Sequence, residues 1–233
     1  WHPTYRLPLK IAEPNRRTTF THDANGNVLT KTVQATTDAT GAQAFSSTLT
    51  GAADKWTYTY NAVGQVLTID GPRTDATDKI TYAYDTSGNL ITITNAAGHV
   101  TTLSNYDAHG HAGRIVDPNG IATDLTYHPR GWLASSTVTD GTAIETTTYA
   151  YDGVGQLTGV TLPKGAKILY TYDAAHRLTA IADSLGNKIT YTIDNMGNRI
   201  NEQVKDPGGA LARQTSRLYD ALNRLQQVTG GAQ

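Results

Sequence analysis

Cysteine is absent from the 233 residues of this sequence, so neither disulfide bonds nor thiol chemistry can contribute to it. The absence is compatible with export, which usually favours disulfides without requiring them. No apolar run approaches the roughly 18 residues that a membrane-spanning helix needs. The sequence at Trp1 also has none of the features of a signal peptide. We therefore expect no transmembrane segment and no signal peptide in this stretch.

Charge of one sign is not in excess either. Lysine and arginine number 19, aspartate and glutamate number 20, and the formal net charge is −1. Charges of both signs are mixed along the chain, which gives no electrostatic basis for binding nucleic acid or an anionic membrane. The nucleophile-elbow, P-loop and dinucleotide-binding fingerprints are missing as well. We expect a protein that is not an enzyme and that uses no cofactor.

Apolar residues make up 38% of the chain, and the mean hydropathy is −0.40. These values are low for a globular core. They fit thin repeats, in which each unit buries its apolar face against its neighbours.

One stretch, Ile80–Leu90, contains the unit that the rest of the chain repeats. Ile80, Tyr82 and Tyr84 are spaced by two, so they share one face of an extended strand. Asp85 and Gly88 occupy the first and fourth positions of a type I turn, where Asp accepts backbone N–H bonds and Gly tolerates a positive φ. The stretch therefore predicts a strand, a tight turn and the start of a second strand.

This unit occurs nine times, which makes a repeat array the firmest inference from the sequence. Two copies end on His or Asn, which also tolerate a positive φ. The further turns are Asp23 to Gly26, Asn61 to Gly64, Asp107 to Gly110, His128 to Gly131, Asp152 to Gly155, Asp194 to Gly197, Asp173 to His176 and Asp220 to Asn223. The repeated aromatic face comprises Tyr60, Tyr82, Tyr84, Tyr106, Tyr127, Tyr149, Tyr151, Tyr170, Tyr172, Tyr191 and Tyr219.

The repeat is about 21 residues long, and a second turn lies midway in most copies, as at Asn95 to Gly98 and Asp183 to Gly186. Each repeat is then strand, turn, strand, turn, with strands of about six to eight residues. We predict an all-β fold with almost no helix, in which an antiparallel β-meander winds into a spiral or cocoon-like shell as its twist accumulates. Residues 1–233 form a single array in this interpretation, with an irregular insertion at about 27–55 that forms a longer hairpin or an exposed loop.

At these residues the sequence resembles the Rhs/YD-repeat family, whose signature is Tyr-Asp-x-x-Gly-Arg/Asn-Leu. The signature stands here at Tyr84–Leu90, Tyr151–Leu157 and, with His in place of Gly, at Tyr172–Leu178. The resemblance covers nearly the whole chain apart from the insertion. The family includes bacterial polymorphic toxins, insecticidal toxin-complex subunits and the animal teneurins.

The resemblance implies a β-sheet wound into a hollow shell that, in bacterial members, encloses a C-terminal toxin domain. It also implies a secreted or cell-surface protein, in many members exported by type VI secretion. The expected partners are therefore the enclosed toxin domain of the parent chain and secretion-apparatus proteins. The chain begins mid-pattern and shows no polar caps, so we interpret it as an internal piece of a longer array with the toxin domain outside it.

Several residue groups have a second interpretation. The repeated aspartates could bind calcium, but each is about 21 residues from the next and already has a turn to form. His109 and His111 form the one tight histidine pair, with His99 and Asp107 nearby. We expect no metal there, because metal sites usually need three or four ligands in fixed geometry and the two histidines straddle a predicted turn. Asp206-Pro207-Gly208-Gly209 superficially resembles the family's self-cleaving segment, but it falls where the repeat needs a turn.

The aromatic face also permits a different function. Tyrosines in a row could stack sugar rings, or they could pack repeat against repeat. Packing is the favoured interpretation. The alternative, a cell-surface repeat that binds carbohydrate through this row, stays open at this stage.

Overall fold

The computed structural model describes residues 1–232, which contain nineteen strands and one short 3-10 helix. The predicted antiparallel all-β fold with almost no helix is confirmed. The chain divides into two compact units, residues 1–120 and the residues from 121 onward. No helix in the described residues is long and apolar enough to cross a membrane.

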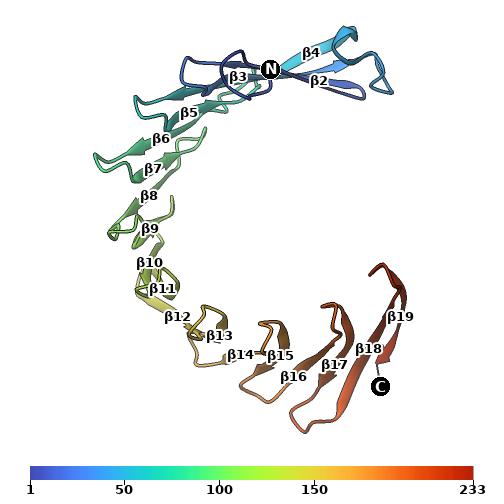
Figure 1. The fold of residues 1–233 in the computed structure, drawn as a ribbon. Helices are drawn as coiled ribbons and strands as arrows, with labels where there is room; N and C mark the ends of the chain where they lie inside the picture. The colour runs from blue at the N-terminus through green and yellow to red at the C-terminus, as the bar shows by residue number, and fades with distance from the viewer. Residues whose placement is uncertain (233) are drawn as a thin grey trace. The chain divides into compact units, whose positions relative to one another are not determined.

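The first unit is a meander in which each strand pairs antiparallel with the next one along the chain (Figure 1). Its strands are β1 (Lys10–Glu13), β2 (Arg16–His22), β3 (Val28–Thr36), β4 (Leu49–Tyr60), β5 (Val66–Asp70), β6 (Ile80–Tyr84), β7 (Leu90–Thr94), β8 (Val100–Ser104) and β9 (Arg114–Val116), with the 3-10 helix η1 (Ala44–Ser46) between β3 and β4.

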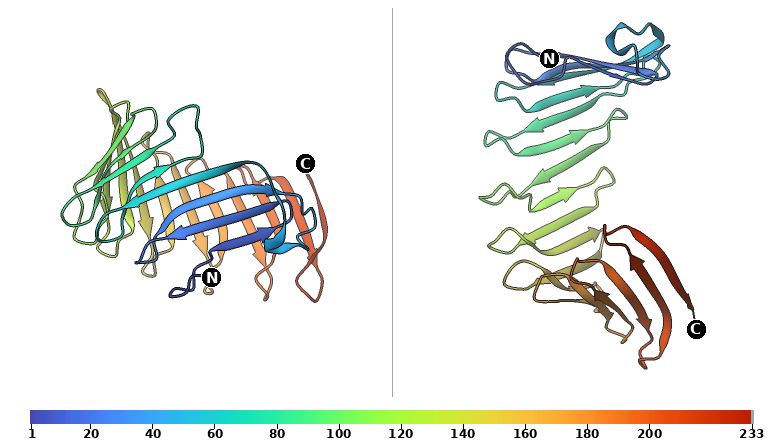
Figure 2. Two further views of the ribbon diagram at one scale, coloured as in Figure 1. Left: turned by 90° about the horizontal axis from the view of Figure 1, so that it is seen from above. Right: turned by 45° about the vertical axis from the view of Figure 1, so that its right-hand side comes forward.

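The second unit repeats the arrangement, and Figure 2 shows its strands side by side in one layer. Its strands are β10 (Ala122–Tyr127), β11 (Leu133–Asp140), β12 (Ala143–Tyr151), β13 (Leu157–Thr161), β14 (Lys167–Tyr172), β15 (Leu178–Asp183), β16 (Lys188–Ile193), β17 (Arg199–Lys205), β18 (Leu211–Tyr219) and β19 (Leu225–Ala232).

A single layer leaves almost no closed core. Among the described residues only two apolar side chains are buried, Ala122 and Ala180. The two faces differ in the way that alternation predicts: on β14, Tyr170 and Tyr172 are half-buried while Thr171 between them is exposed. Cross-strand side-chain pairs therefore replace a core as the source of packing.

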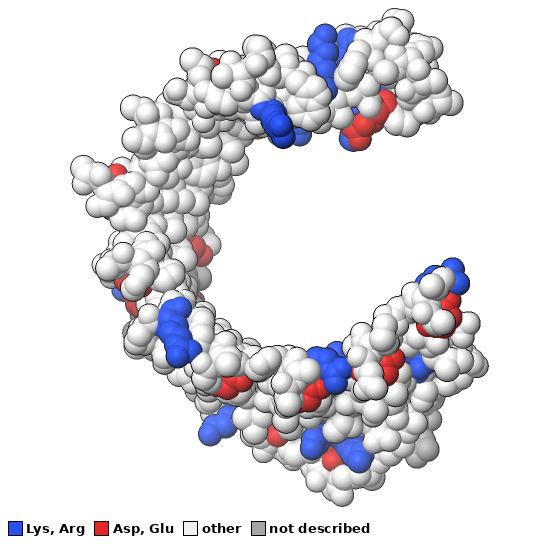
Figure 3. Space-filling view, viewed as in Figure 1, with Lys and Arg blue, Asp and Glu red and all other residues white. Residues whose placement is uncertain are grey.

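Threonine hydroxyls make such pairs at several places between neighbouring strands. The Oγ1 atoms of Thr59 and Thr68 lie 2.7 Å apart across β4 and β5, and those of Thr137 and Thr146 lie 3.0 Å apart across β11 and β12. On the face that Figure 3 shows, acidic and basic side chains are scattered and most of the surface is uncharged. The threonine-rich composition thus gives the sheet a polar bonding pattern.

The segment from 27 to 55 is mostly strand. It forms the long β3–β4 hairpin, whose connecting loop contains η1. Asp38, only 4% exposed, organises the loop: its Oδ1 accepts the Gly41 N–H at 2.9 Å and its Oδ2 accepts the Gln43 N–H at 2.7 Å. The Asn15 N–H donates to the Asp38 carbonyl at 2.7 Å, which attaches the loop to the turn between β1 and β2.

Candidate functional site

The aspartate turns lie between strands at one end of each hairpin, and Asp85 shows their geometry. The Gly88 N–H donates to the Asp85 carbonyl at 3.1 Å, and the Asp85 N–H donates to the Asn89 carbonyl at 2.9 Å. Asp85 Oδ1 accepts the N–H groups of Ser87 and Asn89 at 2.9 and 2.8 Å. Its Oδ2 accepts Asn89 Nδ2 at 2.9 Å. One carboxylate thus satisfies three donors within five residues.

The same pattern recurs with Asp, or Asn at position 61, as the first residue. The fourth residue takes a positive φ throughout: +86° at Gly88, but also +63° at His176 and +62° at Asn223 in the two copies without Gly. The remaining predicted turns of this series, beginning at Asp23, Asn61, Asp107, His128, Asp152, Asp173, Asp194 and Asp220, all close with a bond from the fourth N–H to the first carbonyl. The predicted glycines Gly26, Gly64, Gly110, Gly131, Gly155 and Gly197 all have positive φ.

These donors change the acidity of the carboxyl groups. Hydrogen bonds from the side chain and then the backbone of Asn89 lower the pKa of Asp85. The side chain of His111 is the main cause that lowers the pKa of Asp107 to about 2. At neutral pH both groups are ionised acceptors, already engaged in their own turns. The structure thus places these aspartates in separate turns and does not bring them together in pairs.

A second feature links one turn to the next, and we call it the turn ladder. In three of the turns it uses the side chain of the fifth residue. Gln65 Nε2 donates to the Gly88 carbonyl at 2.7 Å. In the second unit Gln156 Nε2 donates to the His176 carbonyl at 3.0 Å, and Arg177 Nη1 donates to the Asp194 carbonyl at 2.8 Å. Sequence reasoning missed this role, although amide, guanidinium or imidazole groups recur at the fifth position.

Four tyrosines that directly precede a turn, Tyr60, Tyr84, Tyr106 and Tyr172, make a third type of contact. The Tyr84 hydroxyl donates to the Val66 carbonyl at 2.9 Å, and the Tyr172 hydroxyl donates to the Leu157 carbonyl at 2.9 Å. Tyr60 does the same to Val28 at 2.8 Å. In each case the acceptor is the first strand residue after the preceding turn. The Tyr106 hydroxyl makes the equivalent bond to the Leu90 carbonyl.

Burial is the main cause that raises the pKa of Tyr60 and of Tyr106. These hydroxyls are therefore neutral donors that fasten a repeat to the one before it. Tyrosines whose hydroxyls bond the backbone of the neighbouring repeat contribute to packing between repeats. Tyr82, Tyr149, Tyr170, Tyr191 and Tyr219 make no hydroxyl hydrogen bond within the described part of the chain, and Tyr191 instead lies 3.6 Å beneath the Arg199 guanidinium.

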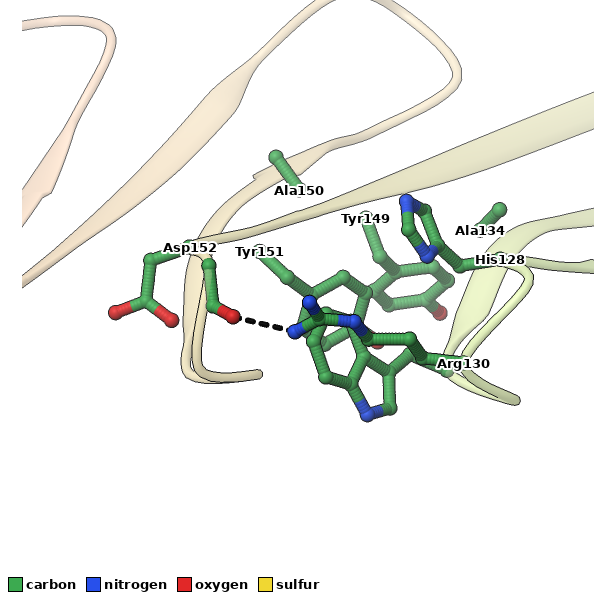
Figure 4. A pocket seen from close by; sticks show the side chains of 9 residues that line it. His128, Arg130, Ala134, Tyr149, Ala150, Tyr151 and Asp152 are labelled. Carbon is green, nitrogen blue, oxygen red and sulfur yellow. Dashed lines mark hydrogen bonds between the residues drawn. The ribbon is translucent and has the colours of Figure 1, made fainter.

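The turn that begins at His128 has neither the carboxylate of the Asp turns nor the amide of Asn61, and it lines a pocket of about 470 Å³ between β11 and β12 (Figure 4). His128 replaces the aspartate, and its ring stacks on Trp132 with centroids 5.5 Å apart. The Trp132 ring also contacts Tyr151 at 5.4 Å and lies below the Arg130 guanidinium at 5.3 Å. Arg130 Nη1 donates to the Gly153 carbonyl, drawn as the dashed line. An aromatic stack here takes the place of the missing carboxylate.

The Asp107 turn brings together three groups that could hold a metal ion. One ligand atom from each of Asp107, His109 and His111 lies within 4.8 Å of the others. His111 Nδ1 is 2.9 Å from Asp107 Oδ2, and His109 Nδ1 is 4.0 Å from the same oxygen. The sequence identified the histidine pair with Asp107 nearby, and favoured a chance surface pair because residues 109 and 111 straddle a turn.

The model of the teneurin YD-shell family matches residues 18–202 of this chain. No curated protein sequence matches it. The structure of TcdB2–TccC3 with Cdc42 matches 93% of the chain and 12% of its own, with a TM-score of 0.76 and 19% identity. The structure of TcdB2–TccC3 without its hypervariable C-terminal region matches 94% of the chain and 12% of its own, with a TM-score of 0.76 and 18% identity.

A third structure is the pore form of the Photorhabdus luminescens Tc holotoxin. It matches 94% of this chain and 16% of its own, with a TM-score of 0.50 and 15% identity. At these identities the structural likeness establishes the fold alone. The chain therefore spans a small part of the solved chains that share its fold.

Proposed function

Because this chain belongs to the teneurin YD-shell family, we propose that it is a non-enzymatic wall segment of a bacterial Rhs-repeat polymorphic toxin. In this proposal the wall encloses and protects a C-terminal toxin domain that lies outside residues 1–233 of the sequence. The parent protein is secreted or displayed at the cell surface, and its partners are the enclosed domain and the export machinery.

The observation that carries the proposal is the way successive repeats are fastened. Each hairpin satisfies its backbone through its ladder pairs and turn. The Tyr84 and Tyr172 hydroxyls and the turn ladder then bond one repeat to the next. Such bonds extend a sheet in one direction without needing a core, which is what a thin wall requires. The carboxylates that could serve catalysis are occupied by turn donors, which supports a structural role.

The two faces of the sheet provide the test. Because the array has no cysteine, single cysteines can be placed on opposite faces of β14 in the full-length protein. Ile168→Cys lies on the half-buried tyrosine face, and Leu169→Cys lies on the exposed face. We expect a bulky maleimide reagent to modify one position rapidly and to leave the other protected until the protein is denatured.

A cross-linker attached at the protected position should join the wall to the C-terminal region, as peptide mass spectrometry would reveal. The unsubstituted protein gives the background from any cysteines elsewhere. Equal modification of both positions in the native protein would contradict an enclosing wall. Protection without any cross-link to the C-terminal region would keep the wall and reject the enclosed domain.

A second candidate function, carbohydrate binding, is favoured by one feature, the pocket at Trp132. Its Tyr149 and Tyr151 rings belong to the aromatic face, and Trp132 and Arg130 add a stacking surface and a hydrogen-bond donor. A glycan array probed with the wild-type chain and with Trp132→Ala tests it. Binding that Trp132→Ala abolishes would support a sugar site, and an array without any binder would remove this candidate.

A further inference from the structure

We propose that Asp107, His109 and His111 form a binding site for a divalent transition-metal ion of the zinc class. The ion would be held by Asp107 Oδ2 and by one imidazole nitrogen from each histidine, with water completing its coordination. The three ligand atoms lie within 4.8 Å of one another in a single five-residue turn. This inference is independent of the proposed shell function.

The turn orients the carboxylate before any ion arrives. Asp107 Oδ1 accepts the backbone N–H groups of His109 and His111 at 2.8 and 3.0 Å. These bonds fix one oxygen and leave Oδ2 directed at the imidazoles. Bonds to the non-ligating atoms of a metal ligand are what hold it in a productive orientation. Gly110, with φ at +81°, closes the turn and brings His111 back beside Asp107.

The distances between the three ligand atoms fit a zinc ion after small movements of the two histidine side chains. Zinc bonds to nitrogen and oxygen of about 2.0–2.2 Å place tetrahedral ligands about 3.4 Å apart. The Asp107 Oδ2 to His111 Nδ1 distance is 2.9 Å and must open slightly, and the distance from the same oxygen to His109 Nδ1 is 4.0 Å and must close. The His109 side chain is 71% exposed, so it can move at little cost.

Binding of the ion at His111 would require the imidazole proton to be on the nitrogen that does not bind the ion. When His111 Nδ1 carries a proton, that proton lies between Nδ1 and Asp107 Oδ2, which are 2.9 Å apart. The ion would take its place, and the proton would reside on the other ring nitrogen. Two imidazoles and one carboxylate suit zinc, nickel or copper, whereas calcium and magnesium prefer oxygen ligands alone.

The chain contains natural comparisons for two of the three ligands, His111 and Asp107. Asn89 and Asn198 occupy the position of His111 in other turns and donate to the carboxylate at 2.9 Å in both cases. His111→Asn should therefore keep the turn and remove an imidazole. Asn95 begins a turn that ends in His99, and its amide lies 3.3 Å from the His99 ring nitrogen. Asp107→Asn should reproduce that turn without the ligand oxygen.

The experiment is a calorimetric titration of the untagged chain with zinc chloride, followed by NMR of the histidine rings. We expect one ion per chain, with shifts confined to His109 and His111. His109→Ala, His111→Asn and Asp107→Asn should each weaken binding at least tenfold. His99→Ala is the matched control and should leave the affinity unchanged. Circular dichroism checks that every variant retains its strands.

Three results of the titrations would overturn the proposal, and a competition with magnesium supplies a fourth. They are the absence of saturable zinc binding, an affinity unaffected by His109→Ala and His111→Asn in folded protein, and an equal loss in His99→Ala. The last would mean that zinc binds scattered surface histidines. Displacement of zinc by equimolar magnesium would also contradict the assigned ligand chemistry, because imidazole ligands disfavour magnesium.

Discussion

The tyrosine contacts on strand β14 allow a prediction of how much one hydroxyl hydrogen bond contributes to the free energy of unfolding. On β14, the Tyr172 hydroxyl donates to the Leu157 carbonyl at 2.9 Å, whereas the Tyr170 hydroxyl has no such partner in the described residues. Both rings are half-buried on the same face. Tyr172→Phe removes one half-buried hydrogen bond and no ring, so we expect the free energy of unfolding to fall by about 1 kcal/mol. Tyr170→Phe should change it by less than about 0.5 kcal/mol.

Two measurements check this pair. Urea unfolding of both variants gives the difference in free energy of unfolding, provided that circular dichroism and fluorescence report one transition. Amide hydrogen exchange gives the local effect: β13 amides should exchange about fivefold faster in Tyr172→Phe, the equivalent of about 1 kcal/mol. If Tyr170→Phe destabilised the chain as much as Tyr172→Phe, the hydroxyl bond would not be the fastening we infer.

Three further perturbations test the turns. Gly155→Ala should lower the free energy of unfolding by about 1–3 kcal/mol, because φ there is +95° and a Cβ would lie 2.5 Å from the Trp132 ring. Gly197→Ala should lower it less, because Gly197 has a similar φ of +92° but open space around it. Thermal melts that rank the two variants in the opposite order would contradict the contact with Trp132. Gln156→Ala should lower the free energy of unfolding by about 1–2 kcal/mol, since it removes the turn-ladder bond to the His176 carbonyl and the 2.8 Å contact between Gln156 Oε1 and His176 Nδ1. An unchanged midpoint of urea unfolding would count against the ladder. The pKa of Asp107 lies at about 2 against an ordinary 3.8. The contribution of the ionised carboxylate to folding stability should therefore be complete above about pH 4 and be lost as the pH falls through 2. A carboxyl NMR titration of the metal-free chain with a midpoint near 3.8 would refute this.

The turns and strands were predictable because their causes are local. Asp85 and Gly88 determine a turn through bonds within five residues, and Tyr82 and Tyr84 share a face because a strand has a period of two. Asp206, which falls where the repeat needs a turn, forms the same turn with Gly209, whose φ is +84°. Local chemistry therefore decides most of the secondary structure.

The contacts between repeats could not be derived in the same way. Nothing in the sequence states that the Tyr60 hydroxyl reaches Val28, because the two are 32 residues apart and the distance depends on the length of the β3–β4 hairpin. The turn from Leu162 to Gly165 is indicated in the sequence by Pro163 alone, because its first residue has no side-chain acceptor, although its backbone closes as the others do. The sequence places Asp107 near His109 and His111, but it does not show that one atom from each lies within 4.8 Å of the others, because that depends on the folded turn.

The exceptional turn at His128 shows what the carboxylate contributes elsewhere. The backbone closes there without it, since the Gly131 N–H donates to the His128 carbonyl at 2.7 Å. The fifth residue is then free of its usual bond to the carboxylate, and Trp132 covers Gly155 of the next turn while Arg130 bonds the Gly153 carbonyl. Contact between adjacent turns is thus kept by different chemistry. A sheet with almost no core depends for its stability on contacts between neighbouring repeats. Different side chains can therefore supply the hydrogen-bond donor, provided that the contact between adjacent turns is made.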